Sequence, residues 1–196
     1  MNNNIQWQKH AIKREQREHL MGHKSIVIWL TGLSGSGKST IGNYVENLLY
    51  KEEIHSFLLD GDELRLGLSH DLGFKKEDRT ESNRRTAEVA NILMNAGIVT
   101  IVSKISPFQK ERENTKRIIS TEHFHEIYVK CSLEECEKRD PKGLYEKARS
   151  GEIKYFTGIS QEYEPPQNPN LILDTNILTV EESSDQLFQY IKSQIL

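Results

Sequence analysis

The chain contains a complete phosphate-binding loop pattern, G-x-x-x-x-G-K-[ST], at residues 32–39. An apolar run at 26–30 precedes it like a buried strand, and residues 40–45 follow it like the first turns of a helix. A glycine- and serine-rich turn without any ligand is the alternative. Because every fixed position of the pattern is present in the right context, the sequence favours a strand, a phosphate-binding turn and a helix.

The residue types in this loop suit a nucleoside triphosphate. Glycines let the backbone approach a polyphosphate closely, and the loop amides and the helix N-terminus offer donors to anionic oxygens. We expect Lys38 to reach the β- and γ-phosphates and the Ser39 hydroxyl to ligate Mg²⁺. The predicted nucleotide contacts are Gly32, Leu33, Ser34, Gly35, Ser36, Gly37, Lys38, Ser39 and Thr40.

Bulk properties restrict the class of protein. A chain of 196 residues fits one domain with a full core, its apolar runs are too short to span a bilayer, and its start lacks a secretory signal. The formal net charge of −3 argues against a nucleic-acid partner. With only Cys131 and Cys136, the composition indicates reduced thiols. We therefore expect a cytoplasmic protein with neither a membrane nor a nucleic acid as its partner.

Strand and helix patterns alternate from residue 25 onward, which predicts an α/β fold with a parallel sheet flanked by helices. Residues 1–24, with the early Trp7, are predicted to be a polar arm or surface helix, and residues 25–196 one domain. The expected strands are 26–30, 56–59, 98–102, 126–129 and 171–173. The expected helices are 9–20, 38–51, 79–95, 108–120, 133–139 and 179–195, the last beginning with a capping box.

Residues 140–170 hold glycine, proline and many charges without a sustained period, so we predict a mobile lid with short helical pieces. Six basic and three acidic residues lie within 138–154. Such a segment suits a small polyanion held in a cleft, although a solvated helix face is the simpler explanation.

Two carboxylates follow the second predicted strand, at Asp60 and Asp62. Ligands of open α/β sheets bind at the carboxyl ends of the strands, where a carboxylate can hold Mg²⁺ or accept a proton from an attacking hydroxyl. We assign Asp62 to catalysis and, with Ser39, to the metal. We expect Asp60 to cap the next turn, and the alternative is that both are turn residues around Gly61.

The remaining sequence favours a small-molecule kinase over other triphosphate-binding proteins. No Asn-Lys-x-Asp segment for guanine is present, and no later strand ends in Asp-x-x-Gly, which argues against a GTPase. A closing lid would exclude water, so that the acceptor hydroxyl receives the phosphoryl group.

Several segments in this order resemble adenylyl-sulfate kinases. They are WLTGLSGSGKST (29–40), LDGD (59–62), DLGF (71–74), EDR (77–79), NRR (83–85), ISPF (105–108), RDPKGLY (139–145) and FTGI (156–159). The resemblance runs from about residue 7 to residue 174 and implies the P-loop kinase fold. It further implies ATP-dependent phosphorylation of the ribose 3′-hydroxyl of adenosine 5′-phosphosulfate (APS), giving 3′-phosphoadenosine 5′-phosphosulfate (PAPS).

The resemblance also implies roles for single residues. The catalytic residues are Lys38, Asp62 and Ser106, and Arg139 contacts ATP. The acceptor contacts are Arg65, Phe74, Arg79, Asn83, Ile105, Ser106, Lys142, Lys154 and Phe156. From the sequence alone, core packing is the favoured interpretation of both phenylalanines, and the resemblance shifts it toward stacking on the adenine of the acceptor. The serine corresponding to Ser106 has been regarded as a phosphoserine intermediate, but direct in-line transfer is physically simpler.

Further expectations concern partners and departures from the family pattern. The resemblance implies a homodimer, with any ATP sulfurylase partner on a separate chain. Glu63, Leu66, Lys104 and Gln109 replace residues that are usual in the family. Lys104 stands out because a lysine near the sheet edge must find an anion or solvent. A P-loop kinase for another hydroxylated nucleotide or metabolite, and a non-catalytic nucleotide-binding regulator, are the alternative functions.

Overall fold

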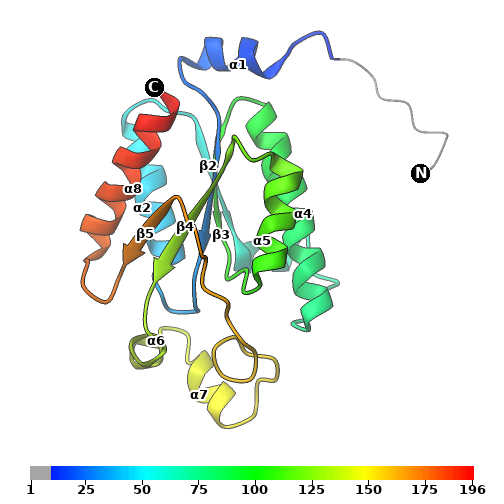
Figure 1. Cartoon of the computed structure of the whole chain (residues 1–196), viewed down its shortest axis with the longest axis vertical. Helices are drawn as coiled ribbons and strands as arrows, with labels where there is room; N and C mark the ends of the chain where they lie inside the picture. Colours follow the sequence, from blue (N-terminus) through cyan, green and yellow to red (C-terminus); the bar gives the residue numbers. More distant parts are fainter. Residues whose placement is uncertain (1–9) are drawn as a thin grey trace, which may run out of the picture.

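Five parallel strands form the centre of the computed structural model, which describes residues 10–196 (Figure 1). They are β1 (Val27–Thr31), β2 (Ser56–Asp60), β3 (Val99–Ser103), β4 (Phe124–Lys130) and β5 (Leu171–Asp174). Their order across the sheet is β2-β3-β1-β4-β5. In register, Ser103 pairs with Asp60 of β2 on one side and with Leu30 of β1 on the other. The carboxyl ends of the three strands therefore lie next to one another.

Helices cover both faces of this sheet. They are α1 (Arg14–Met21), α2 (Lys38–Lys51), α3 (Gly61–Leu66), α4 (Lys76–Asn95), α5 (Gln109–Ile119), α6 (Leu133–Arg139), α7 (Leu144–Arg149) and α8 (Val180–Ile195). Figure 1 shows α2 and α8 on one face and α4 and α5 on the other, with α6 and α7 beyond the carboxyl ends of the strands. None of the described helices is long and apolar enough to cross a membrane.

The sequence of β1 explains why both faces are covered. Every residue of this strand is buried, and successive side chains point to opposite faces. Ile28 and Leu30 belong to the core cluster shared with α2 and α8, whereas Val27 and Trp29 belong to the cluster shared with α4. A strand that is apolar at consecutive positions is stable only between two layers of helices.

A third cluster, which we call the lid cluster, lies beyond the sheet and consists of Cys131, Cys136, Tyr145, Ala148 and Phe156. Leu33 of the phosphate-binding loop packs against it. Both cysteines are free and buried. The lid is thus anchored to the loop beneath it through apolar contacts.

The part of the N-terminal arm that the structure describes contains one helix, α1. Arg17 donates to the carbonyl of Asn95 at the end of α4, over 3.2 Å. Glu18 accepts from both the amide and the hydroxyl of Ser25. These contacts tie α1 to the start of the domain, while Trp7 and the rest of residues 1–9 lie outside the described residues.

Most predicted elements are confirmed. Each strand is found within two residues of its predicted bounds, and the predicted helices 38–51 and 133–139 match α2 and α6. The capping box of α8 is present, with Thr179 accepting from the Glu182 amide and Glu182 from the Thr179 amide. Helix α3 was not predicted, and α4 begins three residues before its predicted start.

Candidate active site

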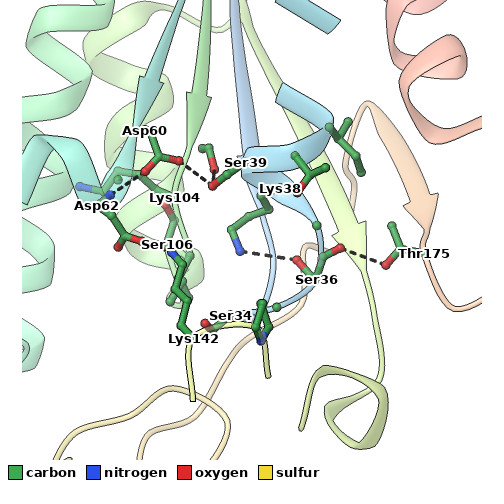
Figure 2. A pocket seen from close by; sticks show the side chains of 18 of the residues that line it. Ser34, Ser36, Lys38, Ser39, Asp60, Asp62, Lys104, Ser106, Lys142 and Thr175 are labelled. Carbon is green, nitrogen blue, oxygen red and sulfur yellow. Dashed lines mark hydrogen bonds and ion pairs between the residues drawn. The ribbon is translucent and has the colours of Figure 1, made fainter. Parts of the chain in front are cut away.

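A cleft of about 530 Å³ opens at the carboxyl edge of the sheet. The phosphate-binding loop and α2 form one side, the ends of β2 and β3 with α3 and α4 form the other, and residues 139–142 cover it (Figure 2). Its size falls within the range of small-molecule sites. Segments far apart in the sequence meet here because parallel strands end at one edge.

Two glycines of the loop are required by its geometry. At Gly32, a Cβ atom would lie 2.4 Å from the carbonyl oxygen of Val129. Gly37 is the N-cap of α2 and has a φ of 98°, which L-residues with a side chain rarely adopt. The loop therefore presents its amides and the α2 N-terminus to the cleft, an arrangement suited to phosphate.

Lys38 is buried in this loop. Its Nζ donates to the carbonyls of Gly32, over 2.9 Å, and Leu33, over 2.7 Å. Burial lowers the pKa of Lys38 to about 8, while the carboxylates of Asp60 and Asp62 act in the opposite direction. The amine is thus held within the loop, beside the place where a polyphosphate can bind.

Ser39 and Asp60 form the contact at the centre of the cleft. The Ser39 hydroxyl donates to Asp60 Oδ2 over 2.6 Å and lies 3.0 Å from the Ser103 hydroxyl. Asp60 Oδ1 accepts from the Asp62 amide over 2.9 Å, so Asp60 caps α3 as expected. Hydroxyl and carboxylate oxygens are ligands that Mg²⁺ prefers. The donor set fits this ion, and Asp60, rather than Asp62, is the carboxylate bonded to Ser39.

The Asp62 carboxylate is turned toward the lid and not toward Ser39. Its carboxylate pairs with Lys142 of the lid, and 73% of its side chain is exposed. Figure 2 shows the Lys142 side chain reaching up to Asp62 from below. An exposed carboxylate can accept a proton from a bound hydroxyl once this ion pair opens.

Arg65, Phe74 and Arg79 form a wall of the cleft beside α3 and α4, which we call the arginine wall. The guanidinium carbon of Arg65 lies 4.4 Å from the centroid of the Phe74 ring, and that of Arg79 lies 5.5 Å from it. Arg65 donates to the carbonyl of Gly73, and Arg79 donates to those of Phe74 and Tyr155. Burial and the charge of Arg65 lower the pKa of Arg79 to about 10. Two cations around an aromatic ring suit an anionic ligand that carries a flat base.

Asn83 lines the same part of the cleft, held by a buried carboxylate. Its amide nitrogen donates to Glu111 Oε2 over 2.9 Å, and Thr80 donates to Glu111 Oε1 over 2.6 Å. Burial raises the pKa of Glu111. The amide of Asn83 is thereby fixed in one orientation, which leaves its oxygen for other partners.

Ile105 and Ser106 continue the wall beyond β3. The Trp29 indole donates to the Ser106 hydroxyl over 2.9 Å, and Thr31 donates to the Ile105 carbonyl over 2.7 Å. Ser106 has a φ of 44°, a strained conformation for a residue other than glycine. The buried Arg112 donates to the Ser106 carbonyl over 2.7 Å and so helps to hold this turn.

Not every predicted contact lines the cleft. Phe156 is buried in the lid cluster, with its ring edge-on to Tyr145 at 4.9 Å, and Lys154 is exposed outside the cleft. Neither can touch a ligand unless the lid rearranges, so their contacts with the acceptor stay predictions. Arg139 does line the cleft, where it donates to the Thr175 carbonyl over 2.6 Å.

Two residues that line the cleft, Ser103 and Thr175, were not predicted from the sequence, and Lys104 was singled out there only as a departure from the family pattern. Ser103 lies beside Ser39, Lys104 lines the floor between the two halves, and Thr175 donates to the carbonyl of Ser36 over 3.0 Å. Ser103 ends β3, Lys104 directly follows it, and Thr175 directly follows β5. The rule that pointed to Asp60, applied to every strand end, would have found all three.

Comparison with known proteins identifies relatives of the chain. The family model described as Adenylylsulphate kinase matches residues 24–174. Over 190 residues, the chain is 50% identical to an adenylyl-sulfate kinase of Staphylococcus epidermidis, covering 97% of this chain and 96% of the relative. It is also 50% identical to that of Clostridium acetobutylicum over 189 residues, covering 96% and 94%.

Solved structures give a similar result. The APS kinase CysC of Mycobacterium tuberculosis, solved in complex with AMPPNP and APS, has a TM-score of 0.83 and is 40% identical, covering 86% of this chain and 98% of that one. A hexameric APS kinase from Thiobacillus denitrificans has a TM-score of 0.66 and is 26% identical, covering 91% of this chain and 30% of that one.

Proposed function

The chain belongs to the adenylyl-sulfate kinase family, and from this membership we propose how its residues divide the work of the reaction. The enzyme transfers the γ-phosphoryl group of ATP to the ribose 3′-hydroxyl of APS, giving PAPS and ADP in sulfate assimilation. One observation supports our division of roles above the others. The phosphate-binding loop and the arginine wall share a single cleft, with Asp62 at its rim.

The phosphate-binding loop and α2 hold ATP. The loop amides and Lys38 bind the phosphates, and Arg139 lies near the rest of the nucleotide. Ser39 would hold Mg²⁺, assisted by Asp60 or Asp62, because the contact between Ser39 and Asp60 already brings two oxygen ligands together. An ion held by these residues would neutralise charge on the phosphates.

The arginine wall holds APS. Arg65 and Arg79 face the phosphosulfate, and Phe74, which is 54% exposed, offers its ring to the adenine. Asn83, Ile105 and Lys142 complete the acceptor site. If the lid closes further on binding, Phe156 and Lys154 reach the acceptor as well.

The transfer is direct. The 3′-oxygen forms a bond to the γ-phosphorus while the bond from that phosphorus to the β,γ-bridging oxygen breaks, leaving ADP. The hydroxyl proton moves to the Asp62 carboxylate and then to solvent. Lys142 must leave Asp62 for this step, and it then stays near the transferred phosphoryl group. Ser106 orients the end of β3, because its hydroxyl accepts from the Trp29 indole, and as a residue that lines the cleft it contacts the acceptor.

We further propose a cytoplasmic homodimer. The two free, buried thiols support the location, since oxidising compartments favour disulfides. An ATP sulfurylase that supplies APS would be a separate chain. Assembly differs among relatives, because one APS kinase is hexameric, so sedimentation of the purified protein is the direct measurement of its oligomeric state.

A turnover assay tests the proposed function. The full chain is incubated with Mg-ATP and APS, and both ADP and PAPS are measured, with adenosine and other hydroxyl acceptors as controls. With APS as the acceptor we expect equal amounts of ADP and PAPS, and with the other acceptors we expect neither product. ADP formation that does not depend on APS, or equal rates with the control acceptors, would contradict it.

A further inference from the structure

Lys104 is a buried lysine without an ionic partner. It directly follows β3 and is only 8% exposed, yet it lines the cleft. Its Nζ donates to two hydroxyls of α4, Ser82 Oγ over 2.7 Å and Thr86 Oγ1 over 3.1 Å. Among residues 10–196 no carboxylate lies within ion-pair distance of this amine. Burying a charge in this way is unfavourable unless an anion compensates it.

The charged groups around Lys104 are mostly positive. Arg65 faces it from α3 and Arg79 from α4, and the nearest acid on α5, Glu111, has both oxygens engaged by Thr80 and Asn83. At the rim, Asp60 is bonded to Ser39 and Asp62 to Lys142. Burial, together with the two arginines, lowers the pKa of Lys104 to about 7, and Glu111 offsets this only in part.

We propose that Lys104 is a specificity-determining residue of the acceptor site, whose ammonium group joins the arginine wall in receiving the anionic phosphosulfate. The proposal rests on the proposed function, because it takes APS as the acceptor. Figure 2 shows Lys104 near Asp62 and Ser106, across the cleft from Lys38. An anion bound there supplies the charge that the protein itself does not.

Acceptor binding is then coupled to a proton. Without ligand, Lys104 is largely neutral above pH 7, since its like-charged neighbours and its burial disfavour the ammonium form. A bound anion favours the ammonium form, so the protein takes up a proton when APS binds. By linkage, the affinity for APS falls as the pH rises above 7.

A purely structural role for Lys104 predicts APS binding that does not depend on pH through this residue. Its two hydrogen bonds fasten the end of β3 to α4, and losing them can loosen the site. Such loosening changes stability, and it weakens APS binding equally at every pH. Proton uptake therefore separates the two roles.

The test measures APS binding to the full chain by calorimetry in the presence of ADP, where no transfer can occur. At pH 8, buffers of different ionisation enthalpy give the number of protons taken up. We expect roughly 0.5–1 proton per APS for the wild type and close to none for Lys104→Met. Arg79 and Glu111 are present in both proteins, so the difference belongs to Lys104.

Steady-state kinetics provide the second measurement. The wild-type KM for APS should rise by up to about tenfold per pH unit above pH 7, while that of Lys104→Met stays flat. Lys38 gives the KM for ATP a pH dependence of its own, which should be the same in both proteins. Lys110→Met, which removes an exposed lysine on α5, should behave like the wild type.

Equal proton uptake by the wild type and Lys104→Met would overturn the inference, as would parallel pH profiles of the KM for APS. If Lys104→Met does not fold, as judged by circular dichroism, Lys104→Gln is measured in the same way, because its amide can still donate to the hydroxyls of α4. Failure of the proposed function is a separate result: the wild type would then neither bind nor phosphorylate APS at any pH.

Discussion

At the scale of single residues, two buried lysines mark the two halves of the cleft. Lys38 donates to backbone carbonyls of its own loop, and Lys104 donates to hydroxyls of α4. Both have a lowered pKa because burial disfavours the charged form. Each amine is held by neutral oxygens and makes no ion pair with a carboxylate, so an arriving phosphate or phosphosulfate favours the protonated form of both lysines.

The assignment of Asp62 gives the first prediction. Asp62→Asn keeps the shape of the side chain but removes the proton acceptor and the ion pair with Lys142. We expect kcat to fall by about 10²–10⁴-fold, with the far-ultraviolet spectrum unchanged. Glu63→Gln, an exposed change in the same helix, is the matched control. A kcat within threefold of the wild type would show that another group accepts the proton.

The arginine wall gives the second prediction. Arg79→Ala removes a cation at 5.5 Å from the Phe74 ring and two hydrogen bonds, to the carbonyls of Phe74 and Tyr155. We expect the KM for APS to rise by about 10–100-fold, while the KM for ATP stays within about twofold. The control is Arg84→Ala on the same helix, whose side chain is 51% exposed and pairs with Glu81. A selective loss of ATP affinity would move Arg79 to the nucleotide half.

Sequence reasoning located the cleft but not all of its contacts. Asp60, Asp62 and Ser39 were found because strand ends and a phosphate loop leave local signals. The contact of Ser39 with Asp60 was missed because it joins the first turn of α2 to the end of β2, 21 residues later in the chain, and no local pattern gives their distance. Lys104 was recognised as a departure, but its partners lie 18 and 22 residues earlier, and no spacing rule identifies them.

At the scale of elements, predictability followed the length and periodicity of each segment. Strands such as β1 and β3 are buried at every position and rich in apolar β-branched residues, and the sequence predicted them to within a residue. The six-residue helix α3 escaped because one and a half turns carry no period. α4 begins earlier than predicted because its first turn is polar and starts from Lys75, which makes no side-chain cap.

The contact between lid and loop gives the third prediction. The Tyr145 hydroxyl donates to the Ser34 carbonyl over 2.9 Å and so ties α7 to the phosphate-binding loop. Tyr145→Phe removes this bond alone, worth about 1 kcal/mol. We expect a rise of a few-fold in the KM for ATP and faster ATP hydrolysis without APS, because a looser lid admits water.

Tyr155→Phe is the control for this lid variant, because the Tyr155 side chain belongs to the same segment and the residue is 45% exposed. ADP release without APS is measured for both proteins beside the wild type. Unchanged hydrolysis in Tyr145→Phe would mean that the lid cluster alone keeps the lid in place.

At the scale of the whole molecule, the parallel sheet brings the chemistry together. The strand order places β3 between β2 and β1, so Asp60, Ser103 and the phosphate-binding loop meet at one edge. Because two anionic substrates bind at this edge, several cationic side chains lie close together beneath the lid. Excess positive charge in an interior lowers the stability of the folded state, and this effect depends on pH.

The last prediction concerns this dependence. The pKa of Lys104 is about 7 in the folded protein and is lowered from its ordinary value of 10.5. Between these values the unfolded chain binds more protons than the folded one, so the unfolding free energy rises with pH. The full destabilising effect of Lys104 is present below pH 7, shrinks as the pH rises, and disappears above about pH 10.5. Lys104→Met lacks this effect, so its gain in stability should be largest at pH 7 and shrink as the pH rises.

Urea unfolding of the wild type and Lys104→Met at pH 7, 8.5 and 10 measures this difference. Between pH 7.5 and 9.5 the difference in unfolding free energy should narrow by up to about 1.4 kcal/mol per pH unit. Lys38 also has a lowered pKa, about 8, but it is present in both proteins and cancels. A constant difference across this range would mean that Lys104 remains charged in the folded protein, held by Ser82 and Thr86 alone.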